Sequence, residues 1–141
     1  GMRASGVRIA IIAVVEGATV DAQASARDTF VHVDTGGREL EQAPDRVFRC
    51  ALSQAPSRGD LITGDMYEVE YTCHFYYTPT KDAEDRIALD MEQVTYDLIA
   101  LNSQDADIYK SDAQSGAVFE AEGLIVVSVP IQVSYRLTGV N

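Results

Sequence analysis

The chain has 141 residues, the length of one domain, and folding is expected to bury about two thirds of the surface that its unfolded form exposes. Apolar residues make up 46% and charged residues 23%, which excludes a disordered, collagen-like or coiled-coil chain. Lysine and arginine number 11 against 22 acids, for a net charge of -11, and no basic cluster interrupts the acidic background. We therefore expect no nucleic-acid partner.

The N-terminal segment MRASGVRIAIIAVVEGATVDAQASA, residues 2–26, admits two interpretations. Its early arginines, its apolar run 9–15 and its Ala-Ser-Ala ending are typical of an export signal. However, the run is short, Glu16 and Asp21 follow it, and it falls well below the roughly 20 apolar residues that span a bilayer. We favour a helix, with a removed signal as the alternative. The apolar stripe of this helix would contain Val7, Ile11, Val14 and Ala18.

Two segments before residue 60 alternate apolar and polar side chains, TFVHVD (29–34) and DRVFRCAL (45–52), and each predicts a strand. The glycine pair 36–37 between them predicts a hairpin turn. It lacks the spacing of a phosphate-binding loop. Residues 53–65, rich in Pro, Gly, Ser and Asp, predict an exposed loop.

The segment DMYEVEYTCHFYYTP keeps a period of two residues and predicts a long strand that Pro79 ends. Thr80 is the expected N-cap of a helix whose first turns carry acids. The helix has a single apolar seam about six turns long. The seam consists of Ile87, Met91, Val94, Leu98 and Leu101.

Residues 102–123 are polar, with an apolar interruption at 108–109 that predicts a small strand and a turn at Gly123. Residues 124–137 place one apolar face along a final long strand, in which Pro130 predicts an edge or a bulge. A sheet with one apolar face needs a cover, which two amphipathic helices provide. The expected fold of residues 1–141 is therefore a single α+β domain, a two-layer sandwich of an antiparallel or mixed sheet with both helices on one face.

Candidate chemistry is sparse in this sequence. Cys50 and Cys73 lie in different predicted strands and are interpreted as free thiols, with one disulfide left open. Together with His32 and His74 they lack the spacing of a metal site, so we expect no metal and no cofactor. Neither histidine has a nucleophile in a recognisable setting, so no enzymatic activity is expected. The helix acids are interpreted as a solvated face: Asp82, Glu84, Asp85, Asp90 and Glu92.

The order of these segments resembles the tail terminator, or tail completion, proteins of long-tailed bacteriophages. The resemblance rests on the N-terminal helix and on three segments: YEVEYTCHFYYTP, the acidic helix start TKDAEDRIALDMEQVTYDLIALN, and the closing strand LIVVSVPIQVSYRL. It covers residues 60–138 best. It implies a structural protein, of which six copies form a ring on the tail tube, stop its polymerisation and present the surface that joins the head.

The resemblance implies as partners a second copy of the chain, the tail tube protein and a head-tail connector protein, with no membrane. It also implies a place in the virion tail after assembly in the host cytoplasm. We expect the interfaces in the predicted loops 54–65 and 103–116. The residues expected to form them are Arg58, Asp60, Asp105, Asp107 and Lys110.

Two alternatives stay open. One is another virion component of similar size, such as a head-tail connector or minor tail protein. The other is an exported small domain that loses residues 2–26 and binds a ligand on its sheet.

Overall fold

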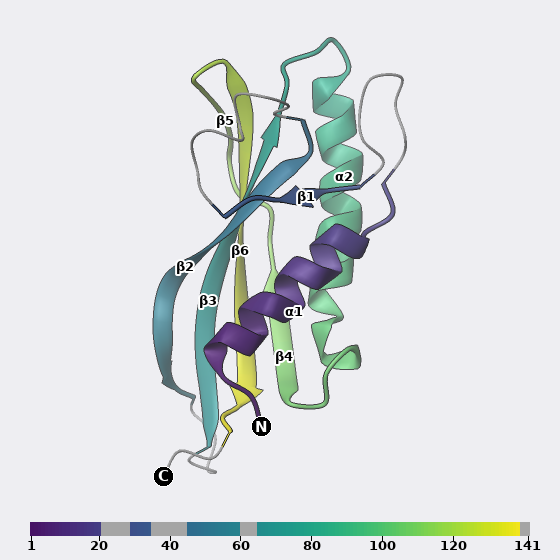
Figure 1. Ribbon diagram of the computed structural model, residues 1–141. Coiled ribbons are helices and arrows are strands. Elements are labelled where there is room, and N and C mark those ends of the chain that lie inside the picture. The colour runs from purple at the N-terminus through teal and green to yellow at the C-terminus, as the bar shows by residue number, and fades with distance from the viewer. Residues whose placement is uncertain (21–28, 35–44, 60–64, 139–141) are drawn as a thin grey trace.

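The computed structural model describes residues 1–20, 29–34, 45–59 and 65–138 (Figure 1). Two helices and six strands make it an α+β protein, as predicted. In chain order the elements are α1 (Ala4–Gly17), β1 (Val31–His32), β2 (Val47–Arg58), β3 (Met66–Tyr77), α2 (Ala83–Ile99), a 3-10 turn (Leu101–Ser103), β4 (Ile108–Ala113), β5 (Val118–Ala121) and β6 (Leu124–Arg136). The predicted glycine turn at 36–37 and the interface residue Asp60 lie outside the described residues.

The six strands form one curled, mixed sheet in the order β1-β2-β3-β6-β4, and β5 pairs with β6 as well (Figure 1). β3 and β6 pair without a break, from Met66 opposite Arg136 to Tyr77 opposite Ile125. β1 runs parallel to β2, and the other pairs are antiparallel. The hairpin predicted between β1 and β2 is therefore wrong, because a hairpin joins antiparallel strands.

The core combines one face of β3 and β6 with the buried stripes of both helices. In α1 the buried residues are Val7, Ile11 and Val15, and Ala18 just after the helix is buried as predicted, whereas the predicted stripe residue Val14 is only half buried. In α2 the predicted seam is fully confirmed from Ile87 to Leu98. No described helix is long and apolar enough to cross a membrane.

Two predicted loops contain strand residues. β2 continues to Arg58, because its main chain still pairs with β3, although two register shifts on either side of Gln54 interrupt the pairing. β5 was missed, and a two-residue turn joins it to β6. Both turn residues have positive φ, 53° at Glu122 and 78° at Gly123, which is the conformation of a tight type I′ hairpin.

Pro130 lies in β6, which has neighbours on both sides and is no edge strand. The Ser128 carbonyl accepts a hydrogen bond from the Gly116 amide, so it points to the edge of β6 that β4 and β5 share. Pro130 follows two residues later in the strand, and its nitrogen points to the same edge. On that side the pairing with β4 reaches Ile131 and the pairing with β5 begins at Val127. Pro130 therefore occupies the gap between two partner strands, where no amide proton is needed.

α2 begins later and ends earlier than predicted. Thr80 is not its N-cap: its hydroxyl donates to the Asp82 carboxylate at 2.7 Å, and Asp82 occupies the cap position. At the other end the helix stops at Ile99, and Leu101 lies in the 3-10 turn. The Ser111 hydroxyl of β4 lies 2.8 Å from the Leu98 carbonyl oxygen and 2.9 Å from that of Ile99, so its one proton is shared between two of the last helical carbonyls.

Candidate interaction surfaces

Four of the five predicted interface residues are described. They belong to the end of β2, to the turn before β4 and to the start of β4, and Figure 1 shows these segments at the same end of the molecule. Arg58 ends β2, and Lys110 lies in β4, so neither belongs to the loop that was predicted for it. Asp105 and Asp107 lie in the turn before β4, where the Asp105 carboxylate accepts a 2.9 Å hydrogen bond from the Asp107 amide. Asp107 also pairs with the amino terminus at 3.1 Å.

The last seven residues of β2, Leu52–Arg58, form a segment that we call the arm. Every one of them is exposed, although they belong to a regular strand. Nearer the body, the free edge of β2 is covered: the Arg8 guanidinium of α1 donates to the Cys50 carbonyl at 3.1 Å. The arm continues beyond this cover and carries an exposed leucine, Leu52, and a cation, Arg58, at its tip.

A groove of about 610 Å³ lies at the opposite end, between the first half of α2 and the hairpin of β5 and β6. We call it the α2–β5 groove. Its floor is apolar and largely buried, formed by Ile87, Met91, Ile125 and Val127. Val118 and Phe119 line it as exposed apolar side chains, and the three carboxylates that border it are Glu84, Glu92 and Glu120.

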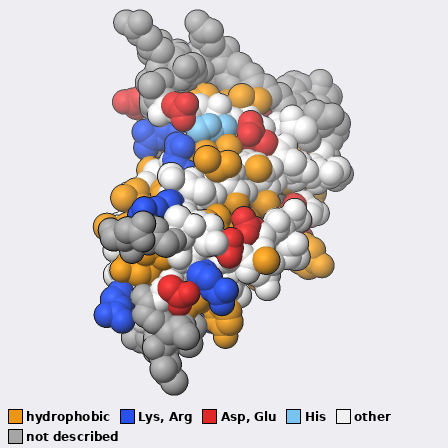
Figure 2. Space-filling view, turned by 60° about the horizontal axis from the view of Figure 1, so that its bottom comes forward, with side chains coloured by type: hydrophobic (Ala, Val, Ile, Leu, Met, Phe, Trp, Pro, Cys, Tyr) orange, Lys and Arg blue, Asp and Glu red, His pale blue; other side chains and the backbone are white. Residues whose placement is uncertain are grey.

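Charged side chains of both signs lie on the face drawn in Figure 2. Figure 2 shows acidic and basic side chains interspersed among apolar ones on the face that it presents, with no extended patch of one sign. The described residues of this face therefore form no basic stripe of the kind that tracks a nucleic-acid backbone.

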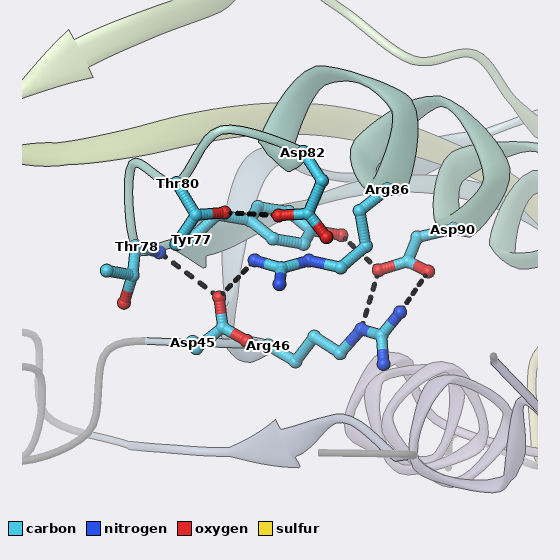
Figure 3. A network of polar contacts seen from close by, with 8 residues as sticks. All are labelled: Asp45, Arg46, Tyr77, Thr78, Thr80, Asp82, Arg86 and Asp90. Carbon is cyan, nitrogen blue, oxygen red and sulfur yellow. Dashed lines mark hydrogen bonds and ion pairs between the residues drawn. The ribbon is translucent and has the colours of Figure 1, made fainter. Parts of the chain in front are cut away.

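A buried ionic cluster joins the start of β2 to α2 (Figure 3). The Arg46 guanidinium donates to both oxygens of Asp90, at 2.8 and 2.9 Å, and the Tyr77 hydroxyl donates to the same carboxylate at 2.9 Å. Next to it, Arg86 donates to Asp45 at 2.7 Å and lies over the Tyr77 ring, 5.9 Å from its centre. Burial and the Asp90 charge both raise the pKa of Tyr77, so its hydroxyl stays a donor.

The cluster corrects the interpretation of the helix acids. Asp82, Glu84 and Asp85 are exposed as predicted, whereas Asp90 is 1% exposed. The signal was present in the sequence, because Asp90 follows Ile87 by three residues and precedes Val94 by four, on the apolar seam itself. Since Arg46, Tyr77 and Asp90 are buried and hydrogen-bonded to one another, we assign this cluster to the architecture rather than to a ligand.

Cys50 and Cys73 are free, buried and directly opposite each other in β2 and β3. The Cys50 carbonyl points away from β3 toward Arg8, so the two cysteines form a non-hydrogen-bonded pair, whose side chains approach closely. A hydrogen bond between the thiols lowers the pKa of Cys50 and, together with burial, raises that of Cys73 well above its usual range.

The two histidines lie apart from this pair. His74 makes a 2.9 Å hydrogen bond to Ser128 across β3 and β6, and burial followed by the nearby Arg49 charge lowers its pKa. His32 lies 3.7 Å from the Asp34 carboxylate and packs on Phe48. Within the described parts of the chain, no group of three or more His, Cys, Asp or Glu side chains is placed to hold a metal ion.

A comparison with protein-family profiles and with characterised proteins finds no match to this sequence. The site is therefore defined by its own geometry. It consists of an ordered, exposed arm at one end of the molecule and an apolar groove with an acidic border at the other.

Proposed function

We propose that this chain is a tail terminator of long-tailed bacteriophages, a structural subunit that closes as a ring of copies on the tail tube, stops its polymerisation and presents a surface to the head. The observation that carries the proposal is the succession of β3, an acidic-start α2 and a closing β6 that pairs along the whole of β3. This is the layout on which the resemblance rests.

The proposal includes the finer architecture, a two-layer sandwich with both helices on one face of the sheet. It is supported by the composition of the core, in which Ile11 of α1 and Val94 of α2 belong to the same cluster as Cys73 and Val129 of the sheet. A fold of this kind leaves the opposite sheet face and the strand ends free for protein partners.

Deletion of the gene in the phage or prophage that carries it tests the function, with electron microscopy of the tails produced. We expect tails of uncontrolled length without heads, because nothing stops the tube, and we expect the gene supplied in trans to restore normal tails. Headless tails of normal length would instead identify a head-tail connector. Normal particles would refute both assignments.

The α2–β5 groove favours one alternative, the exported ligand-binding domain, because an apolar cavity of this size suits a small molecule. The discriminating measurement is the intact mass of the untagged chain after expression in a host able to export it. Removal of the residues through Ala26 would support export, whereas retention of α1 would exclude it.

A further inference from the structure

We infer that copies of this chain join head to tail, with the arm of one copy seated in the α2–β5 groove of the next. This inference rests on the proposed function, because it supplies the contact by which a ring would close. The occupant is a second copy of the chain, and the contact uses two different surfaces of each copy.

The arm is built to contact a partner through its side chains. Its seven residues are exposed, and among the described strands they pair with β3 alone. Pro56 lacks an amide proton, and the register shifts beside it distort the edge, which are two devices that prevent another strand from extending the sheet. What remains available for docking is an apolar side chain, Leu52, which is 54% exposed, and the Arg58 cation.

The groove offers the complementary chemistry. Its apolar floor removes a side chain such as that of Leu52 from water, and its exposed wall residues Val118 and Phe119 gain cover in the same step. Among the described residues that line it, the border carries Glu84, Glu92 and Glu120 and no cation. In a chain of net charge -11, most contacts between copies repel, so a cation placed among three carboxylates selects this contact over others.

The positions of the two surfaces determine the symmetry. The arm lies at the end of the molecule where β2 ends, and the groove lies at the end where α2 begins and β5 turns (Figure 1). A contact between two such surfaces is heterologous, so each bound copy leaves one free arm and one free groove. Repetition of the contact gives a closed ring where the rotation closes, as the proposed function requires.

Charge reversal across the contact tests it, with the mass of the assembled species followed by light scattering and sedimentation over a wide concentration range. We expect Arg58→Glu alone and Glu92→Arg alone to raise the concentration for half assembly roughly tenfold or more. We expect the double variant to recover most of the loss. Arg3→Glu, an equal change of charge at an exposed position before α1 and outside both the arm and the groove, is the control and should assemble like the wild type.

Three results would overturn the contact: a wild type that is monomeric at every concentration, Arg58→Glu that assembles normally, or a double variant without recovery. Circular dichroism of each variant verifies the fold, and both substituted side chains are exposed. These results are independent of tail length in the deletion strain. If the wild type forms a ring and Arg58→Glu forms it equally well, the contact between arm and groove is refuted and the terminator function stays in place. Normal tails in the deletion strain refute the function alone.

Discussion

Arg46 and Asp90 form a bidentate ion pair between residues 44 positions apart in the sequence, and both side chains are shielded from solvent. Arg46 precedes β2 and has a φ of 54°, in the left-handed region that costs a non-glycine residue about 1 to 2 kcal/mol. The pair holds this strained residue against the middle of α2. A buried pair contributes little net stability relative to apolar packing, but it is costly to break, so it fixes where β2 begins.

Replacement of Asp90 by Asn is expected to destabilise the protein by about 3 to 5 kcal/mol, because the buried Arg46 guanidinium loses the charge of the Asp90 carboxylate. Urea unfolding measures the change in the free energy of unfolding. Asp85→Asn removes the same charge from an exposed position of the same helix and should cost under about 0.5 kcal/mol. Equal effects of the two substitutions would contradict the role given to the pair.

The packing of α1 can be tested with two isoleucines on one helix. Ile11 is 0% exposed and Ile9 is 66% exposed. Ile11→Ala is expected to cost about 2 to 5 kcal/mol through lost burial and a residual cavity, and Ile9→Ala less than about 0.5 kcal/mol. Thermal or urea unfolding of both variants provides the comparison. Similar small losses would show that the protein folds without a docked α1.

The cysteine pair is expected to close into one intrachain disulfide when the folded protein is treated with diamide, which accepts the two hydrogens. The Cα atoms of a non-hydrogen-bonded pair are about 4.5 Å apart, within the range that a disulfide bridges. Under limited alkylation Cys50 should react before Cys73, because its pKa is lowered and that of Cys73 is raised.

Mass spectrometry of peptides measures both the disulfide and the order of alkylation. Cys50→Ser is the control and should give no intrachain disulfide. Preferential alkylation of Cys73, or dimers linked by disulfides in place of the intrachain bond, would contradict the geometry.

His74 is expected to make stability depend on pH. Its folded pKa lies below the unfolded value of about 6.5, so the unfolded chain takes up the proton first as the pH falls. The free energy of unfolding should therefore decrease as the pH is lowered from about 6.5 toward the folded pKa, and this loss should be absent at higher pH.

Urea unfolding between about pH 5 and 8 detects this slope, above the range in which most carboxylates titrate. His74→Gln should reduce it, whereas His32→Gln leaves His74 and its Ser128 partner in place and should retain it. An unchanged slope in His74→Gln would assign the pH dependence to other groups.

The sequence by itself determined the elements with strong periodicity. The alternation of β3 and β6 and the seam of α2 are local patterns, and burial of one face follows from them, so the α+β class could be predicted. The exposed acids of the first turn of α2 followed from the same patterns, whereas the pairing of Cys50 opposite Cys73 did not.

Only the tertiary structure decided which strands are neighbours and what their side chains meet. The parallel pairing of β1 with β2, the extension of β2 into the arm and the burial of Asp90 against Arg46 depend on residues far apart in the chain. The α2–β5 groove likewise arises where a helix and a hairpin come together. Local propensity carries no information on such contacts, because their free energy comes from long-range pairing and burial that exist only once the whole domain has folded.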